Sequence, residues 1–221
     1  MVNKLKRGLI VSCQAREDNP LHGPPFMAAM AKAAEQGGAV GLRANGAPDI
    51  KAIRALSQLP VIGLNKRDVA GYEAYITPDW CDVEEVARAQ AHIIAIDATK
   101  QSRPAGPAYP FIQELKQRGY TILADISSLD EGLEAARAGA DYIATTLSGY
   151  TPYSPQQKGP DLDLVSALVE TLDTPIIAEG RYAQLEQIQA AFNRGAYAVV
   201  VGTAITNPRE ITRSLVKRLQ L

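Results

Sequence analysis

The chain has 221 residues, 46% of them hydrophobic, and a formal net charge of −1. This length and apolar content suit a single α/β barrel domain over residues 1–221. Nucleic-acid binders usually carry a marked basic excess, so a nucleic-acid partner is not expected. No apolar stretch approaches the roughly 18 residues needed to cross a bilayer. The basic start of the chain lacks a long apolar region and a cleavage site, so neither a membrane nor a secretory signal is expected.

Short apolar runs rich in Val, Ile, Leu and Ala recur along the chain and predict eight strands buried on both faces. They cover residues 8–13, 39–44, 61–66, 93–99, 121–126, 142–147, 175–180 and 198–203. Stretches with helical periodicity alternate with them, at residues 26–36, 49–58, 82–90, 109–118, 128–139, 163–172 and 184–195, and a further helix is expected at 208–219.

Residues at the ends of the predicted helices support this division. Ser128, followed three positions later by Glu131, is typical of a capping box. Gly37, Gly119 and Gly139, together with Gly195, stand where a left-handed cap would end a helix.

Eight strands alternating with helices predict a (β/α)8 TIM barrel of the phosphate-binding type. An open doubly wound sheet is the alternative. That fold usually has a glycine-rich dinucleotide loop after its first strand, and SCQAREDNP is no such loop.

The carboxyl ends of barrel strands face the active site, and polar residues gather there. They are Ser12, Gln14, Arg43, Asn45, Lys66, Asp97, Thr99, Asp125, Thr145, Thr146, Glu179, Arg181 and Thr203, and the glycines Gly180 and Gly202 lie at the last two strand ends. Single polar strand ends are common, but so many converging on one mouth indicate a site.

Lys66 and Glu179 follow the third and seventh strands, which lie opposite each other in a ring of eight. Such a pair suits a racemase or epimerase that removes a proton from one face of a substrate and returns one to the other. The lysine then needs a lowered pKa and the glutamate a raised one. Burial would shift both pKa values in those directions, and Arg43 would further disfavour the Lys66 ammonium. The alternative is a simple Lys–Glu salt bridge across the mouth.

The segments EGR (179–181) and VGTA (201–204) predict an anion site after the last two strands. Backbone N–H groups of Gly180, Gly202 and Thr203, with the start of a short helix, are typical of phosphate binding there. Arg181 and Arg209 could add charge-assisted hydrogen bonds. Alternatively, these glycines only allow tight turns.

The remaining reactive side chains suggest no further chemistry. His22 and His92 are far apart in sequence, and the two cysteines, Cys13 and Cys81, have no metal-binding spacing, so no metal is expected. Two cysteines in a chain of this length are typical of a reduced, cytoplasmic protein. The loop LSGYTPYS (147–154) either closes on a sugar or is an ordinary surface loop.

Nearly the whole chain resembles the N-acetylmannosamine-6-phosphate 2-epimerase family. The resemblance rests on SCQA (12–15), GLRANG (41–46), IGLNKRD (62–68), YITP (75–78), IIAIDAT (93–99), ADISSLDEG (124–132), TTLSGYT (145–151), PIIAEGRY (175–182) and VVVGTAIT (199–206).

The resemblance implies cofactor-free interconversion of N-acetylmannosamine 6-phosphate and N-acetylglucosamine 6-phosphate, in sialic-acid breakdown. Lys66 matches the residue that abstracts the C2 proton, and Glu179 the residue that donates on the opposite face. Arg43 and Asp125 match residues that hydrogen-bond the sugar and the catalytic pair, and Gln14 matches a substrate contact.

Further expectations concern substrate binding, phosphate binding and the oligomeric state. Thr146 at the sixth strand end joins the expected substrate-binding set, and Gly180, Arg181, Gly202 and Thr203 form the expected phosphate site. The family often has arginine where this chain has Asn207, a departure that affects one phosphate or hydroxyl contact. The family's members are commonly dimers, so a homodimer using the helix at 208–219 is expected.

Two other functions remain open from the sequence. The first is an aldolase-type lyase in which Lys66 forms a Schiff base with a keto-sugar phosphate. The second is a barrel that binds a sugar phosphate without catalysis.

Overall fold

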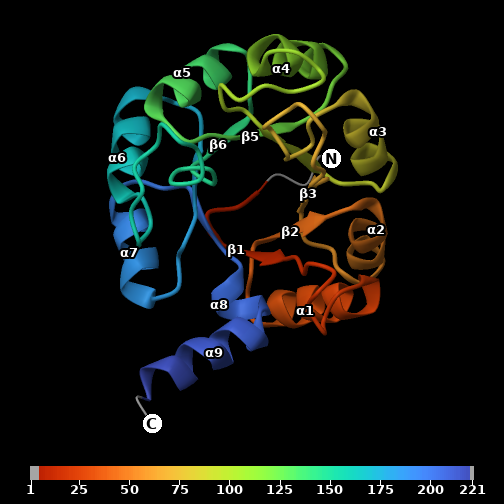
Figure 1. The fold of residues 1–221 in the computed structure, drawn as a ribbon, viewed down its shortest axis with the longest axis vertical. Coiled ribbons are helices and arrows are strands. Elements are labelled where there is room, and N and C mark those ends of the chain that lie inside the picture. The colour runs from red at the N-terminus through yellow and green to blue at the C-terminus, as the bar shows by residue number, and fades with distance from the viewer. Residues whose placement is uncertain (1–4, 220–221) are drawn as a thin grey trace.

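The computed structural model describes residues 5–219, in which eight parallel strands form a closed ring (Figure 1). The strands follow one another around the ring in chain order, and β8 pairs with β1 to close it. The predicted (β/α)8 barrel is therefore confirmed. The strands are β1 (Gly8–Cys13), β2 (Gly41–Asn45), β3 (Val61–Leu64), β4 (Ile93–Asp97), β5 (Ile122–Asp125), β6 (Tyr142–Ala144), β7 (Ile176–Glu179) and β8 (Ala198–Val201).

Helices surround the ring and lie within about two residues of the predicted positions. They are α1 (Pro24–Gln36), α2 (Ala47–Leu56), α3 (Trp80–Arg88), α4 (Ala108–Gln117), α5 (Leu129–Arg137), α6 (Leu162–Thr171), α7 (Leu185–Asn193), α8 (Thr203–Thr206) and α9 (Pro208–Arg218). Several strands end earlier than the apolar runs suggest. The sixth stops at Ala144, and the two threonines that follow use their side chains near the mouth instead.

Each strand buries both faces, which explains its nearly continuous apolar sequence. In β4, Ile93 and Ala95 pack in the core inside the ring, whereas Ile94 and Ile96 pack against the surrounding helices. Successive side chains of a strand point to opposite faces, so this division fixes which residues of every strand face inward.

Close packing between the ring and its helices requires glycine at some outward positions. A Cβ added to Gly63 would lie 2.6 Å from Ala91 Cβ and 2.8 Å from Val86 Cγ1. Both atoms belong to tightly packed groups, so Gly63→Ala would force α3 and the segment after it away from β3.

The helix ends largely follow the sequence patterns. Ser128 and Glu131 form the predicted capping box at the start of α5. Gly119, Gly139 and Gly195 have φ values of +82°, +99° and +91°. The prediction for Gly37 was wrong. That residue keeps a right-handed helical conformation with φ −77°, and the next glycine along the chain takes the left-handed one.

The carboxyl-terminal helix α9 departs from the surrounding ring. It projects from the barrel beyond α8 (Figure 1), and none of its residues is buried. No helix within residues 5–219 is long and apolar enough to cross a membrane.

Candidate active site

Polar side chains replace apolar ones at the carboxyl end of the barrel interior. Leu123 of β5 and Ile177 of β7 belong to the inner core. Two residues further along the same strands, the inward positions are Asp125 and Glu179. Arg43 of β2 lies between outward-facing Leu42 and Ala44 and also points inward. The strand period of two therefore places these three side chains inside one mouth.

The guanidinium of Arg43 joins two carboxylates from distant parts of the chain. Its Nη1 and Nη2 donate to Asp125 Oδ1 at 2.9 Å and Oδ2 at 2.6 Å, a bidentate pair. Nη1 also donates to Glu179 Oε2 at 2.7 Å. Arg43 and Asp125 are buried, and the Glu179 side chain is 13% exposed. Removing Arg43 would leave these buried carboxylates without their cation, and losing one partner of a buried ion pair typically costs about 3–5 kcal/mol.

Two adjacent threonines after β6 position the carboxylates. Thr146 Oγ1 donates to Asp125 Oδ1 at 2.5 Å. Thr145 Oγ1 donates to the carbonyl of Glu179 at 2.9 Å and accepts from its backbone N–H at 3.1 Å. The Thr145 hydroxyl thus continues the β6–β7 ladder past the end of β6. It holds the backbone of Glu179 from both sides.

Lys66 lies just beyond β3, on the opposite side of the ring from β7. Its backbone N–H donates to Asn45 Oδ1 at 2.7 Å, and it forms an isolated antiparallel bridge with Ile76. Within residues 5–219, Lys66 and Glu179 form no ion pair at 4.0 Å or less; Glu179 pairs with Arg43 instead. The salt-bridge alternative therefore does not describe this arrangement.

The surroundings shift the pKa values of Lys66 and Glu179 toward each other. Lys66 is exposed to solvent at the mouth, while the protein packed around its side chain makes desolvation the main cause that lowers its pKa. The charge of Arg43 lowers it further, whereas Glu179 and Asp125 oppose the shift. Desolvation raises the pKa of Glu179, and Arg43 opposes that shift most strongly. Both shifts move a pKa value toward neutral pH, which increases the fraction of neutral lysine and of neutral glutamic acid there.

Tyr75 is a member of this site that reasoning from strand ends missed. It comes from the long connection between β3 and α3, and it packs against the inner core. Burial, followed by the nearby carboxylates of Asp125 and Asp97, raises the pKa of its phenol to about 12. Tyr75 is therefore a neutral phenol whose hydroxyl proton is available to donate. Its only indication in the sequence was its place in the YITP motif.

The β8–β1 side of the mouth contains the expected polar and glycine residues. Gln14 Nε2 donates to Ser12 Oγ at 2.9 Å, while its buried Oε1 has no hydrogen-bond partner among residues 5–219. A Cβ on Gly202 would lie 3.3 Å from Ser12 Cβ, so the two strand ends are close together. Thr203 is the first residue of α8.

Three residues near the expected phosphate site make other contacts. Arg181 donates to the carbonyls of Ser148 and Gly159 rather than projecting freely into the mouth. Arg209 pairs with Asp18 at 3.1 Å. Asn207 caps α9 by accepting from the N–H of Glu210 at 3.3 Å, a contact that explains asparagine at this position.

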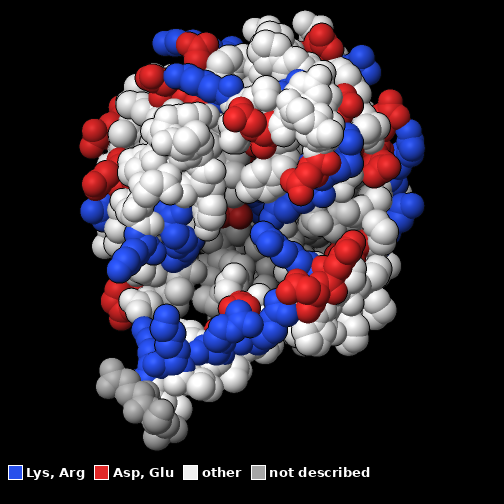
Figure 2. All heavy atoms as spheres, in the orientation of Figure 1, with Lys and Arg blue, Asp and Glu red and all other residues white. Residues whose placement is uncertain are grey.

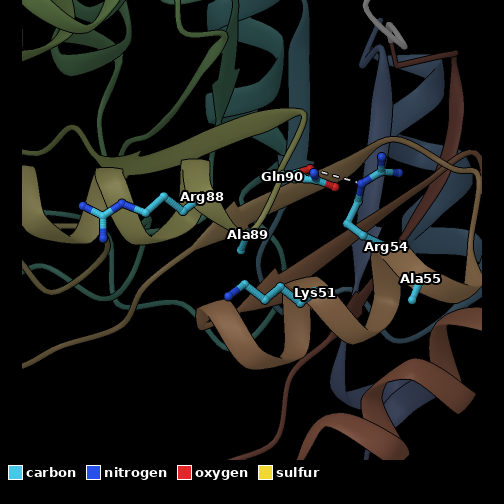
Figure 3. A pocket seen from close by; sticks show the side chains of 6 residues that line it. All are labelled: Lys51, Arg54, Ala55, Arg88, Ala89 and Gln90. Atoms are coloured by element: carbon cyan, nitrogen blue, oxygen red, sulfur yellow. Dashed lines mark hydrogen bonds between the residues drawn. The ribbon is translucent and has the colours of Figure 1, made fainter.

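The mouth opens onto the face drawn in Figure 2, where a hollow contains acidic side-chain atoms at depth and Lys and Arg groups around its rim. A shallow depression of about 330 Å³ lies away from it, between α2 and α3 (Figure 3). Two of its basic residues have local partners: Arg54 Nε donates to the carbonyl of Gln90, and Arg88 pairs with Glu84. Within residues 5–219, no group of three or more potential ligand side chains could hold a metal ion.

A closed barrel with charged and polar side chains gathered at the carboxyl ends of its strands has the architecture of a (β/α)8 barrel enzyme. Residues 27–221 match the model of the NanE family, described as "Putative N-acetylmannosamine-6-phosphate epimerase". The chain belongs to this family.

Individual relatives match over almost the full length. A protein from Caldanaerobacter subterraneus subsp. tengcongensis, named "Putative N-acetylmannosamine-6-phosphate 2-epimerase", is 53% identical over 98% of this chain and 92% of its own. A solved structure described as the N-acetylmannosamine-6-phosphate 2-epimerase from Clostridium perfringens is 44% identical. It superposes with a TM-score of 0.93 over 97% of this chain and 94% of that chain. A thiamine phosphate pyrophosphorylase from Pyrococcus furiosus shares only the fold, with 17% identity and a TM-score of 0.62.

Proposed function

We propose that the protein interconverts N-acetylmannosamine 6-phosphate and N-acetylglucosamine 6-phosphate by inverting C2, as an isomerase of amino-sugar and sialic-acid breakdown. One observation carries the proposal. Lys66 follows β3 and Glu179 ends β7, on opposite sides of the ring, and their pKa values are shifted so that one can accept and the other donate a proton. The names of the relatives supply the substrate, which the geometry alone does not identify.

The first proposed step is removal of the C2 proton by the neutral amine of Lys66. That proton is acidic when C1 is a carbonyl, as in the ring-opened sugar. The electrons of the C2–H bond then form a C1–C2 double bond, and negative charge develops on the C1 oxygen. Arg43 and the neutral phenol of Tyr75 are suitable donors to this enolate oxygen, and such stabilisation is commonly the largest contribution to rate.

The second proposed step is protonation of C2 on the opposite face by the neutral carboxyl of Glu179. This leaves Lys66 as ammonium and Glu179 as carboxylate, and exchange with water restores the starting forms. In the reverse direction the two residues exchange roles. Asp125 receives hydrogen bonds from Arg43 and Thr146, so it supports Arg43 and is a candidate partner for a sugar hydroxyl. The reaction moves only protons and calls for no redox cofactor.

The substrate's phosphate is proposed to lie after β7 and β8, near the backbone N–H groups of Gly180, Gly202 and Thr203. Gln14 is proposed as a further substrate contact, because its buried Oε1 lacks a partner among the described residues. Arg181 belongs to this region of the chain, but its guanidinium already makes two hydrogen bonds to protein carbonyls.

Incubation with N-acetylmannosamine 6-phosphate in D2O, followed by NMR, tests the function. The expected result is deuterium at C2 together with the appearance of N-acetylglucosamine 6-phosphate. Lys66→Ala and Glu179→Ala should each abolish turnover without loss of fold, measured by circular dichroism. No exchange and no product with the wild-type protein would refute the epimerase. A borohydride-trapped substrate adduct on Lys66 would instead identify a Schiff-base lyase.

We also propose a homodimer in which α9 packs against a second copy of the chain. Leu215 and Val216 of α9 are 55% and 61% exposed, and Leu219, directly after the helix, is 61% exposed. Leu185 on α7 is 71% exposed and borders a shallow depression. A projecting helix with an apolar stripe gains stability when a partner covers it, and an identical copy carries a matching exposed surface.

Light scattering coupled to size-exclusion chromatography tests this assembly. The wild-type protein should elute as a dimer, and the double variant Leu215→Glu/Val216→Glu as a monomer. Leu56→Glu is the matched control, because Leu56 is a similarly exposed leucine (53%) on α2. A monomeric wild type, or an unchanged dimer in the double variant, would contradict the proposal.

A cytoplasmic location is also proposed, consistent with two unpaired cysteines, Cys13 and Cys81.

A further inference from the structure

The connection between β6 and α6, residues 145–161, is held at both its base and its tip. At the base, Arg181 Nη1 donates to the carbonyl of Ser148 at 2.8 Å and Nε to the carbonyl of Gly159 at 2.7 Å. These two carbonyls lie near opposite ends of the loop. One guanidinium therefore ties the two ends of the loop to the turn after β7.

The tip of the same loop is anchored to the neighbouring strand connection. Tyr153 donates its hydroxyl proton to Glu131 Oε1 at 2.8 Å. Thr151 Oγ1 donates to Ser127 Oγ at 2.9 Å. Glu131 is fully buried and also accepts from the backbone and hydroxyl of Ser127. With both regions attached, the loop has little freedom to move independently of the barrel.

The segment that carries Arg181 is strained in a way that suits a fixed role. Gly180 and Arg181 have φ values of +114° and +60°, directly after Glu179. A left-handed conformation is uncommon for a residue other than glycine, and such strain persists where the surroundings hold it. Two hydrogen bonds to the loop constrain Arg181, and its guanidinium carbon also lies 5.3 Å from the centroid of the Tyr150 ring. A Cβ on Gly149 would lie 2.7 Å from Arg181 Nη1, so the loop also fits closely around the guanidinium.

Two residues joined by an Arg181 hydrogen bond, Ser148 and Arg181 itself, lie close in sequence to residues of the carboxylate site. Residue 181 follows Glu179 by two positions. Ser148 follows Thr146 by two positions, and Thr146 donates to Asp125. The hydrogen bond between residues 148 and 181 therefore restrains both the segment that carries Glu179 and the segment whose Thr146 contacts Asp125.

We propose that Arg181 is a positioning residue for the proton transfer: it holds the β6–α6 loop and the turn after Glu179 in register and does not bind the phosphate. The inference rests on the proposed epimerase function. A guanidinium engaged with two carbonyls has lost much of its fork for bidentate binding of phosphate. Backbone N–H groups remain the natural phosphate donors in this region.

Arg181→Gly is the informative variant, because glycine adopts φ +60° without strain and removes only the side chain. Arg181→Lys is the second variant. It keeps the charge but cannot make the two-carbonyl contact. Arg194→Gly, which removes an exposed arginine at the end of α7, is the control. Folding of each variant is checked by circular dichroism and thermal unfolding.

Three measurements distinguish an Arg181 that holds the loop from an Arg181 that binds phosphate. In Arg181→Gly and Arg181→Lys we expect amide exchange in residues 147–160 to accelerate about tenfold or more, because local opening becomes easier. We expect kcat to fall about tenfold or more with little change in KM, because misplaced catalytic groups act mainly on the chemical step. The Kd for inorganic phosphate, measured by calorimetry, should stay within about twofold of wild type, because the backbone donors are unchanged. Added guanidinium ion should restore part of the kcat of Arg181→Gly.

A Kd for phosphate weakened about tenfold or more, with unchanged amide exchange, would assign Arg181 to the phosphate and overturn the proposal. Wild-type exchange and wild-type kcat in both variants would overturn it as well. Exchange and phosphate binding do not require turnover. If the wild-type protein failed to epimerise the proposed substrate, these two measurements would still decide whether Arg181 holds the loop.

Discussion

Replacing Thr145 with valine removes one hydroxyl and leaves the side-chain shape almost unchanged. Thr145 is 1% exposed, and its Oγ1 both accepts from the N–H of Glu179 and donates to its carbonyl. The variant leaves that N–H without its partner, in a place where bulk water has little access. An orphaned buried polar group of this kind costs about 1–3 kcal/mol. For a chain of this length, Tm should fall by roughly 2–4 °C per kcal/mol.

The same hydroxyl fixes the backbone of Glu179, so activity should fall as well. A displacement of about 1 Å in a reacting group can cost about a hundredfold in rate. We therefore expect kcat to fall about tenfold to a hundredfold, with KM changed less, in an assay that couples formation of N-acetylglucosamine 6-phosphate to a colour reaction. Circular dichroism melts measure Tm in parallel.

Thr171→Val is the matched control. Its Oγ1 donates to the carbonyl of Ala167 at 2.7 Å, on the exposed surface of α6. The same chemical change there should alter stability by at most about 0.5 kcal/mol and leave kcat unchanged. Wild-type kcat in Thr145→Val, despite a lowered Tm, would refute the positioning of Glu179. An unchanged Tm would refute the hydrogen-bond argument itself.

The remaining predictions concern titration, a helix cap and thiol access. The active forms are neutral Lys66 and neutral Glu179, so a plot of kcat/KM against pH should rise and then fall. Because the pKa of Lys66 is lowered and that of Glu179 is raised, this bell-shaped curve should be narrower than free side chains would give. A flat profile from pH 5 to 10 would contradict this. Asn207→Ala should lose about 0.5–2 kcal/mol of capping, seen as faster amide exchange in α9 with little change in Tm, because α9 buries no residue. A thiol reagent should label Cys81 in the folded protein and Cys13 only after unfolding, because burial raises the pKa of Cys13 to about 12; rapid labelling of both would contradict this.

Patterns that repeat along the chain were sufficient to predict the barrel. Continuous apolar runs identify strands that are covered on both sides, and the interior of β4 shows why a run such as IIAID has no polar position until its end. Local cap chemistry was also readable, as at Ser128 and Glu131. Gly37 was misassigned because two glycines follow α1, and only the backbone geometry distinguishes which one turns left-handed.

The position of a residue on the ring could be predicted, but the direction of its hydrogen bonds could not. The opposition of Lys66 and Glu179 follows from counting strands, and the inward direction of Arg43 from the strand period. The two carbonyl partners of Arg181 come from a loop more than twenty residues earlier in the chain. They depend on how that loop folds back, which no local pattern encodes. Tyr75 was missed for the same reason, since a long connection carries it into the mouth.

The ionic network divides unequally between the two halves of the ring. The first four strands contribute the cations Arg43 and Lys66, and the last four contribute the carboxylates of Asp125 and Glu179. Asp97 at the end of β4 has its own partner in Arg103, on the connection that follows, whereas both carboxylate partners of Arg43 come from the other half of the ring. The first half alone would therefore leave the buried Arg43 without a partner, and closing the ring supplies both. The charges around the proposed proton transfer would thus also favour assembly of the two halves, and recovery of activity on refolding would report that the ring has closed.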